Sequence, residues 1–401
     1  MKVLLIHTSY KQKGGEDAVI ANEEELLRAN GAEVEVLRFS NHQQTLLKIL
    51  QLPFNIAAYN QTVSKLKAFK PDVVHVHNTH FSASPSIFYA AKKFNVPVVV
   101  TLHNYRLLCP SATLFHKGSI YMPSVGQIFP YQAVLKGVYL NSRLLTAWLG
   151  ISMFAHYIAG TWNIPARYIV LGNHSRKLFS LSKYNALVKR MVVKPNFCYE
   201  TENTGLKENF YLYVGRLSQE KGLNVLLEAF TQTTLILKIA GDGPLRDMVA
   251  HYCRQYPNIQ YIGVVNKTEV SELLCKAEAL IFPSVWYETF GMVIIEAFAA
   301  GTPVIASALG NIKELVTDHI NGLHFEPGNA ANLYRKLMYY DTLTVDKKEI
   351  YRQNAKQTYE QHYTPQINAR RLFSVYKDLL PAGNISELRD AVPVGALSVE
   401  S

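Results

Sequence analysis

Residues 279 to 307 read ALIFPSVWYETFGMVIIEAFAAGTPVIAS, and this stretch decides the fold. Its first six residues are typical of a buried strand, residues 285–291 of a loop, and residues 292–300 of an apolar helix that Gly301 ends. Residues 303–307 predict the next strand. A strand, a helix and a strand in this order predict two parallel strands joined by a right-handed crossover.

The same alternation runs through the whole chain. Strand-like runs separated by helix-length segments fall at 2–7, 34–39, 72–77, 98–103, 168–173 and 191–195, and then at 210–215, 235–240, 259–263, 279–284, 303–307 and 322–326. The sequence therefore predicts an α/β protein with two doubly wound, Rossmann-like domains. We expect the loops at the carboxyl ends of their strands to face a central cleft.

Polar segments predict the domain limits. Residues 193–206 change from a strand to a link containing Pro, Asn, Thr and Gly, so the first domain is predicted over 1–195 and the second over 196–364. A terminal helix at about 365–380 is predicted to cross back onto the first domain. Residues 381–401 show no clear period and are predicted to be a mobile tail.

Charge is distributed unevenly along the 401 residues. The net charge is +10, but residues 1–200 hold 22 Lys and Arg against 9 Asp and Glu, and residues 73–199 contain no acidic residue. This stretch predicts an anionic partner, such as a membrane leaflet or a phosphorylated acceptor, unless the basic surface only aids solubility. Nucleic acid is a weaker candidate because no binding motif accompanies the charge.

Neither a membrane span nor a disulfide framework is predicted. The uncharged residues 144–159 fall short of the ~20 residues that a spanning helix needs, so they predict a core helix or a helix in the bilayer interface. The first ten residues hold too short an apolar stretch for a signal peptide. The four cysteines form no CxxC pair. These features predict a cytoplasmic protein without a zinc site.

Two loops of the first domain carry candidate site residues. Gly14 and Gly15 follow the first strand and precede a helix that begins near Glu16, where free N–H groups can bind a phosphate. A flexible surface loop is the alternative. His103 and Asn104 follow another strand, where a histidine can orient a substrate or relay a proton, unless it is structural. His75 and His77 lie on one face of a strand, and core packing explains them as well as function does.

Two loops of the second domain carry further candidate site residues. Arg216 follows a strand end at Gly215, and Lys221 precedes the next helix, so the two cations can hold one diphosphate unless both are solvated surface residues. Glu288 and Glu296 lie ~10 Å apart along a helix axis, too far to attack one bond but suited to a nucleotide sugar. Glu288 is expected to bind sugar hydroxyls and Glu296 a ribose, although a buried lysine would also satisfy Glu296.

The backbone amides of Thr289, Phe290 and Gly291, at the start of that helix, are expected to hold the phosphates. The loop and helix together thus predict one continuous site for a nucleoside-diphosphate sugar.

These blocks together resemble the retaining nucleotide-sugar glycosyltransferases with the GT-B fold, most closely glycosyltransferase family 4, over residues 1 to about 380. The most specific blocks are VGRLSQEKGLNVLLEAF, LKIAGDGPLRDMV, YIGVV and PSVWYETFGMVIIEAFAAGTPVIAS. The first half is similar to members that act in bacterial surface polysaccharide assembly, through HNYRLLCPSATLFHKG and VVKPNF. Its SIYMPSVGQIF lacks the paired cysteines found in many of those relatives.

The resemblance implies roles for the site residues. It makes the first domain the acceptor domain, with Glu16 and Asn104 as acceptor-side candidates, and the second the donor domain. Arg216 and Lys221 would neutralise the donor diphosphate and Glu296 would bind the ribose. Glu288 and His103 would lie at the donor sugar, and Gly14-Gly15 would lie beside the phosphates and the acceptor.

The resemblance also implies retention of anomeric configuration. The chain has no Asp-x-Asp sequence, so a metal-independent reaction without a cofactor is expected, with a nucleoside-diphosphate sugar as co-substrate. The alternatives are a nucleotide-dependent dehydrogenase, disfavoured because no GxGxxG follows the first strand, an inactive binding or scaffold protein, and an epimerase or phosphorylase of the same fold.

Overall fold

The computed structural model describes residues 1–9, 15–41, 51–80, 82–201 and 207–380. The chain divides into two compact units. The first unit comprises residues 1–112, 122–195 and 365–401, and the second comprises 113–121 and 196–364. The short segment 113–121, which the sequence analysis placed in the first domain, is thus grouped with the second. A Cβ atom on Gly118 would lie 3.0 Å from Nε2 of Gln219, which shows how closely this segment contacts the second unit.

The first unit is built on a six-stranded parallel sheet in the order β2-β1-β3-β4-β7-β8. Its strands are β1 (Lys2–Ser9), β2 (Glu33–Ser40), β3 (Val73–Val76), β4 (Val98–Thr101), β7 (Arg167–Val170) and β8 (Met191–Val193). Every residue of β3 and β4 is buried, as expected of parallel strands covered on both faces.

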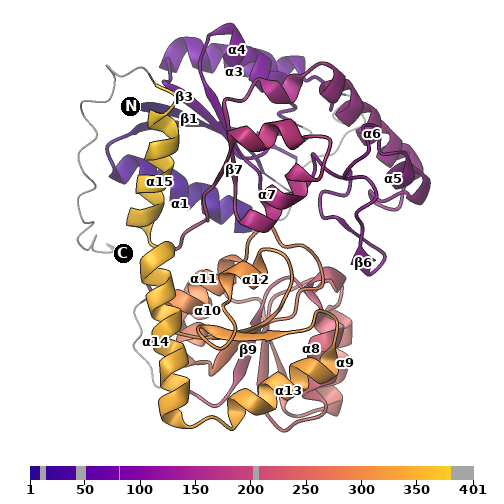
Figure 1. The fold of residues 1–401 in the computed structure, drawn as a ribbon, viewed down its shortest axis with the longest axis vertical. Helices are drawn as coiled ribbons and strands as arrows, with labels where there is room; N and C mark the ends of the chain where they lie inside the picture. The colour runs from indigo at the N-terminus through magenta and orange to yellow at the C-terminus, as the bar shows by residue number, and fades with distance from the viewer. Residues whose placement is uncertain (10–14, 42–50, 81, 202–206, 381–401) are drawn as a thin grey trace. The chain divides into compact units, whose positions relative to one another are not determined.

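Helices of the first unit follow most of its strands (Figure 1). They are α1 (Gly15–Ala29), α3 (Ile56–Phe69), α4 (Ser86–Lys93), α5 (Tyr131–Lys136), α6 (Arg143–Ile158), α7 (Asn173–Ser180) and α15 (Pro365–Lys377), with 3-10 turns η1 (Thr161–Asn163) and η2 (Asn185–Arg190). The terminal helix α15 contacts α1. Side chains from the two ends of the chain therefore share one core.

The second unit has a six-stranded parallel sheet in the order β11-β10-β9-β12-β13-β14. Its strands are β9 (Tyr211–Val214), β10 (Leu237–Ala240), β11 (Ile259–Gly263), β12 (Ala279–Phe282), β13 (Val304–Ser307) and β14 (Gly322–Phe325). Residues 113–121 add a two-stranded antiparallel ribbon of β5 (Phe115–His116) and β6 (Ser119–Ile120).

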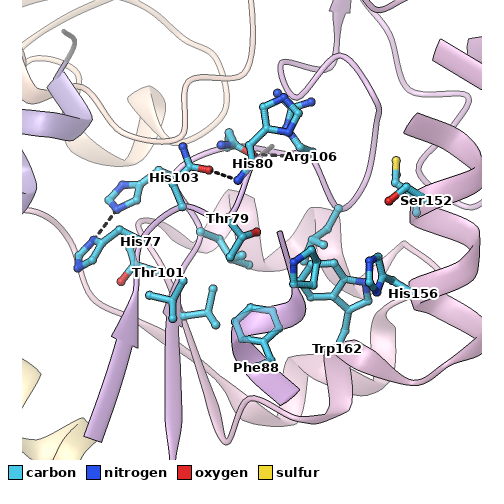
Figure 2. Close-up of a pocket in the computed structure, with 18 of the residues that line it drawn as sticks. His77, Thr79, His80, Phe88, Thr101, His103, Arg106, Ser152, His156 and Trp162 are labelled. Carbon is cyan, nitrogen blue, oxygen red and sulfur yellow. Dashed lines mark hydrogen bonds between the residues drawn. The ribbon is translucent and has the colours of Figure 1, made fainter. Parts of the chain in front are cut away.

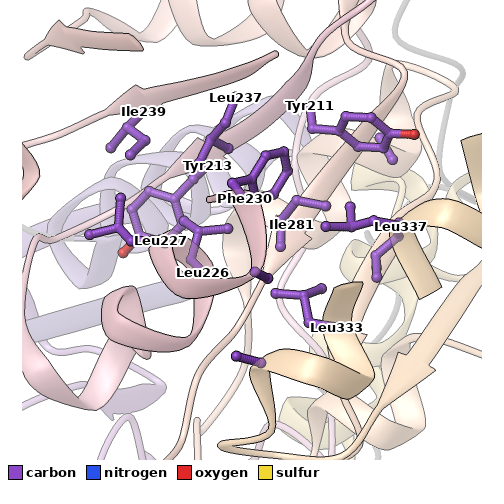
Figure 3. Packing of buried hydrophobic residues seen from close by; sticks show 14 of the residues in the cluster. Tyr211, Tyr213, Leu226, Leu227, Phe230, Leu237, Ile239, Ile281, Leu333 and Leu337 are labelled. Atoms are coloured by element: carbon purple, nitrogen blue, oxygen red, sulfur yellow. The ribbon is translucent and has the colours of Figure 1, made fainter. Parts of the chain in front are cut away.

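The helices of the second unit are α8 (Leu223–Phe230), α9 (Arg246–Gln255), α10 (Lys267–Lys276), α11 (Met292–Ala299), α12 (Ile312–Leu315), α13 (Ala330–Asp341) and α14 (Val345–His362), with the 3-10 turn η3 (Gln219–Lys221). Figure 3 shows side chains of β9, β10, α8 and α13 meeting in one core. Phe230 is fully buried there, and truncating such a ring to Ala typically costs about 3–5 kcal/mol.

The predicted fold class, two doubly wound parallel α/β domains, is confirmed. Each run predicted as a strand overlaps one of the twelve parallel strands. Each strand order reverses direction at one point, between β1 and β3 in the first unit and between β9 and β12 in the second. Such reversals leave a crevice at the carboxyl ends of the strands, where ligands bind in folds of this kind.

Candidate active site

The reversal point of the second unit brings Lys221 to Glu288. Lys221 follows β9 and Glu288 follows β12, and the lysine Nζ lies 2.6 Å from Oε1 of the glutamate. The Ser284 hydroxyl donates to the same carboxylate oxygen at 2.7 Å. The Lys221 ammonium also lies 5.4 Å from the centre of the Trp286 ring. An ammonium group has three donors, so this pairing leaves capacity for a second anion.

One glycine allows this approach. Gly222 adopts φ +71, a left-handed conformation, and a Cβ atom there would lie 1.9 Å from the carbonyl oxygen of Pro283. Only a residue without a side chain lets the loop after β9 lie this close to the loop after β12. Arg216, in the same loop, is exposed, and its guanidinium makes no side-chain hydrogen bond or ion pair with any described residue.

Hydrogen bonds from the Asn311 side chain hold the loop of Thr289, Phe290 and Gly291 in place. Asn311 Nδ2 donates to the carbonyl oxygens of Glu288 and Thr289, at 3.2 and 2.8 Å, and Phe290 is buried. Helix α11 then begins at Met292 without a side-chain cap. The N–H of Ile294 donates to the carbonyl oxygen of Gly291 at 3.0 Å, but the first N–H groups of a helix otherwise lack intrahelical acceptors, so this end favours an anion.

Glu296 lies in the second turn of α11 and is largely buried. Burial raises the pKa of its carboxyl group, and the charge of Lys267 opposes this rise only in part. Within the described residues its carboxylate has neither a hydrogen bond nor an ion pair. A lysine partner, the alternative raised from the sequence, is therefore not found among them. A polar ligand group is still needed to satisfy the carboxylate.

In the first unit, β1 and α1 bring acidic and imidazole groups together. Gly15 begins α1, whereas Gly14 lies outside the described residues. His7 Nε2 lies 3.0 Å from Oδ1 of Asp17. Burial, reinforced by the charge of Asp17, raises the pKa of Glu16 to about 8. Glu16 is therefore mainly protonated at neutral pH, unlike an exposed carboxylate.

His103 follows β4 and lies against a buried imidazole. Its Nε2 lies 3.0 Å from Nδ1 of His77, and the two rings stack with centres 5.2 Å apart. His77 Nε2 lies 3.0 Å from Oε1 of the fully buried Glu23. Burial lowers the pKa of His77 to about 4 and that of His103 well below its usual value, so both rings are neutral at pH 7. The carboxylate therefore favours a proton on His77 Nε2, which leaves His77 Nδ1 to accept from His103 Nε2.

Glu23 forms a buried ion pair with Lys194. Lys194 Nζ lies 3.3 Å from Glu23 Oε2 and donates to Asn368 Oδ1 at 2.9 Å, and both ionic side chains are 2% exposed. Burial alone would raise the pKa of Glu23, but Lys194 and the two imidazoles hold it well below its usual range. His75 Nδ1 lies 2.9 Å from Glu23 Oε1 and 2.7 Å from the Tyr376 hydroxyl of α15.

Glu23, His75 and His77 are close enough to share a metal ion. The Lys194 ammonium, however, already balances the carboxylate, and His75 Nε2 is bound to Thr101 Oγ1 at 2.8 Å. The cluster therefore fits a structural ion pair better than a metal centre.

A pocket opens beside these histidines. Figure 2 shows His77 and His103 at one end and His156 and Trp162 at the other. Phe88 lies between them, and side chains of α6 complete the wall. Asn104 also lines the pocket, and its Oδ1 accepts from the backbone N–H of Arg106 at 3.1 Å. The pocket is mostly apolar with a few polar groups at its ends, which is typical of small-molecule sites.

The structure adds residues that the sequence analysis did not single out, namely Glu23, Lys194, Ser284, Asn311 and Tyr376. Periodicity holds a signal for Glu23, because Val19, Ile20, Leu26 and Leu27 form the buried face of α1 and position 23 lies on it. The contacts of Lys194 and Tyr376 join distant parts of the chain, and no local pattern predicts them.

Two family descriptions match this chain. "Glycosyl transferases group 1" matches residues 200–358, and "Glycosyl transferase 4-like domain" matches residues 8–149. The first match covers both the Lys221–Glu288 pair and Glu296. Each match spans less than half of the chain, and together they identify it as a glycosyltransferase. The likeness to glycosyltransferase family 4 inferred from the sequence is confirmed.

Several relatives of this glycosyltransferase carry related names. Two uncharacterised glycosyltransferases of Methanocaldococcus jannaschii are similar to this chain. The first is 32% identical over 42% of this chain and 45% of its own length. The second is 26% identical over 84% of this chain and 88% of its own length. The O-antigen chain mannosyltransferase C of Escherichia coli is 25% identical over 43% of this chain and 47% of its own length. Two of these three alignments thus span less than half of the relative.

Solved structures share the fold. A glycosyltransferase from Rickettsia africae superimposes with a TM-score of 0.69 at 18% identity, covering 94% of this chain and 98% of that one. Anabaena HepE in complex with UDP gives a TM-score of 0.68 at 17% identity, covering 94% and 100%. The described part of this glycosyltransferase contains no helix long and apolar enough to cross a membrane.

Proposed function

We propose that this glycosyltransferase moves a sugar from a nucleoside-diphosphate sugar to a hydroxyl of a saccharide or lipid-linked saccharide, with retention and without a metal ion. The proposed setting is bacterial cell-surface polysaccharide synthesis at the inner face of the cell membrane. The observation that carries the proposal is the reversal point of the second unit, where Lys221, Glu288 and the uncapped start of α11 meet.

This arrangement is suited to a diphosphate leaving group. As the bond to the donor sugar breaks, negative charge grows on the β-phosphate. Lys221 is held in place by Glu288, so its remaining N–H donors can stabilise this charge without reorganisation. The exposed Arg216 and the α11 amides supply further positive potential. These groups would do what a metal ion does elsewhere.

In this proposal Glu296 binds the ribose of the donor, and Glu288 faces its sugar. The buried carboxyl of Glu296 is without a partner in the described chain, and a ribose diol would satisfy it. Glu288 shares its Oε1 between Lys221 and Ser284, so it fixes the lysine as well as facing the donor sugar.

Retention is supported by what Glu288 already does. A carboxylate bound to an ammonium and a hydroxyl is a poor nucleophile, so the proposed route is attack by the acceptor hydroxyl on the face from which the diphosphate leaves. His103, Asn104 and Glu16 in the first unit are the acceptor-side and sugar-side candidates. His103 is neutral and donates from Nε2 to His77, so its Nδ1 can accept a hydrogen bond from a sugar hydroxyl.

The test is nucleotide binding followed by product analysis. Thermal shifts are measured with UDP, GDP, ADP, CMP and NAD, each with and without EDTA. A shift by one nucleoside diphosphate that survives EDTA and is lost in Glu296→Gln supports the donor site, whereas a shift by NAD alone would indicate a dehydrogenase. Arg335→Gln, a change outside this loop cluster, is the control.

The second candidate function is an inactive nucleotide-sugar-binding or scaffold protein. It predicts the same thermal shift but no product. NMR of the product made from the identified donor separates the two, and an inverted anomeric centre would refute the retaining mechanism.

A further inference from the structure

An apolar face on α5 and α6 has no counterpart elsewhere in the described first unit. Eight of its eleven exposed large hydrophobic residues fall between positions 128 and 158. We define the α5–α6 face by the seven that belong to the two helices and their connection: Tyr131, Leu135, Leu140, Leu144, Ile151, Phe154 and Ile158. Their exposed fractions run from 38% for Phe154 to 84% for Leu144.

These positions share one side of α6. Leu144, Ile151 and Ile158 are seven residues apart, which is close to two helical turns, so their side chains project in nearly one direction. The opposite side of α6 is buried and contributes Leu149, Ser152, Met153 and His156 to the pocket. Helix α5 packs against α6 (Figure 1). Tyr131 and Leu135 of α5 are exposed as well.

All charged residues in the stretch of sequence that contains this face are basic. Residues 73–199 contain 13 Lys and Arg and no Asp or Glu. Lys136 ends α5, Arg143 begins α6, and Lys183 Nζ lies 5.9 Å from the centre of the Tyr157 ring of α6.

The acidic residues of the first unit are confined to a few of its elements. The described acidic residues of the first unit lie in residues 16–72, apart from Asp378, and so belong to the side of β2, β1 and α1. β7 and β8 form the opposite edge of the sheet, and they, α5, α6 and α7 have no acidic residue. Among the described residues, the helices that carry the α5–α6 face therefore hold basic side chains and no acidic ones.

We propose that the α5–α6 face docks on a bilayer that contains anionic lipids. Apolar side chains that enter the interface, flanked by cations that attract lipid phosphates, are the two elements of peripheral membrane binding. A bilayer is favoured over a protein partner with an acidic groove, because seven exposed apolar side chains lie in a stretch that holds cations and no acidic residue.

This inference deepens the proposed function by naming the acceptor class. The buried side of α6 lines the pocket beside His103, so a lipid-linked saccharide with its lipid in the bilayer would approach the pocket along this helix. Only the assignment of the acceptor class rests on the proposed function. Lipid binding by the α5–α6 face requires neither the sugar donor nor sugar transfer.

The experiment is vesicle flotation of the full chain without nucleotide. Vesicles are made of phosphatidylcholine alone or with about one-third phosphatidylglycerol. We expect binding to the anionic vesicles only, weakened by salt. Leu144→Ser/Ile151→Ser/Ile158→Ser should lower partition about 100-fold, a factor of about five for each side chain. Lys136→Gln and Arg143→Gln should each lower it about five-fold.

The matched control is Val345→Ser/Ile350→Ser on α14, where both side chains are similarly exposed, at 76% and 56%. It should bind vesicles like the wild type. Thermal unfolding of the triple variant without nucleotide shows whether it is folded, and Lys136→Gln and Arg143→Gln test the same face if the triple variant is unfolded.

Three outcomes would overturn the proposal: a wild type that does not float with anionic vesicles, a triple variant that floats equally well, and sedimentation showing a wild-type dimer that the triple variant dissociates. The last would assign the face to a second copy of the chain. Transfer to a water-soluble acceptor is measured separately, so a failure of lipid binding is distinguished from a failure of the transferase function.

Discussion

Loss of the Glu23 carboxylate should destabilise the first unit strongly. Glu23 and Lys194 are each 2% exposed, with Oε2 and Nζ 3.3 Å apart. At an effective dielectric constant of about 20, two unit charges at this distance attract by about 5 kcal/mol. Glu23→Gln keeps an acceptor for the two imidazoles but leaves the Lys194 ammonium buried and unbalanced. We therefore expect a loss of about 3–5 kcal/mol.

A double-mutant cycle separates this term from packing. Lys194→Met should cost a similar amount, because it leaves the carboxylate unbalanced, whereas Glu23→Gln/Lys194→Met should lose much less than the sum. The control is the partly exposed Glu24, which pairs with Arg28 one turn along α1 and with Arg38, and Glu24→Gln should cost less than about 1 kcal/mol for each pair.

Urea unfolding of the full chain, followed by hydrogen exchange at β1 and β3 amides, reads the first unit separately. The pKa of Glu23 is depressed in the folded state, so its stabilisation is present above its unfolded pKa and is lost as the pH falls toward the folded value. The difference between wild type and Glu23→Gln should shrink in acid. Single variants that each lose less than about 1 kcal/mol, or a double variant that loses the full sum, would refute the reasoning.

Further predictions concern the two site loops and one pH effect. Lys221→Ala should lower kcat about 100-fold, equivalent to about 3 kcal/mol of transition-state stabilisation, while Lys238→Ala, whose exposed partner is Glu208, should leave it unchanged; near-normal turnover of Lys221→Ala would remove that lysine from the mechanism. Gly222→Ala and Gly328→Ala both place a side chain at positive φ, but only the first meets a backbone oxygen, so urea unfolding should show about 1 kcal/mol lost at Gly328 and several at Gly222; equal losses would show that the loop contact is unimportant. Between its unfolded pKa of 4.5 and its folded pKa of about 8, Glu16 holds a proton in the folded state that the unfolded chain releases, so wild-type stability should fall as the pH rises, by at most about 1.4 kcal/mol per pH unit. Glu16→Gln removes this slope, and unfolding in urea should show its advantage growing with pH; a constant advantage would contradict the assignment.

The fold was accessible from the sequence because each strand is a local signal. Parallel strands covered on both faces are short apolar runs, and KVLLIH or ALIFPS is recognisable without knowing its neighbours. Strand order is not local. The orders β2-β1-β3 and β10-β9-β12, which create the two reversal points, depend on pairing across the whole unit.

The candidate donor residues were accessible for a similar reason. Arg216, Lys221 and Glu288 directly follow predicted strands, where the carboxyl ends of a parallel sheet place ligand-binding loops. The 2.6 Å contact of Lys221 with Glu288 could not be predicted from the sequence, because it joins residues 67 positions apart and depends on Gly222 lying close to Pro283. Sequence reasoning assigned the two side chains to separate parts of the donor, and the structure pairs them.

The sequence by itself determined the periodic features: the alternation of strands and helices, the acid-free stretch of residues 73–199, and the apolar run in α6. Tertiary structure alone decided which side of α6 is buried and which is exposed, because apolar residues occur on both sides and the buried side also carries Thr146, Ser152 and His156. It likewise decided that Glu23 is a buried ion-pair partner whereas Glu24 and Glu25 are not part of that core. Burial and charge balance are properties of contacts between distant segments, and a one-dimensional pattern records the residue types without recording which of them meet.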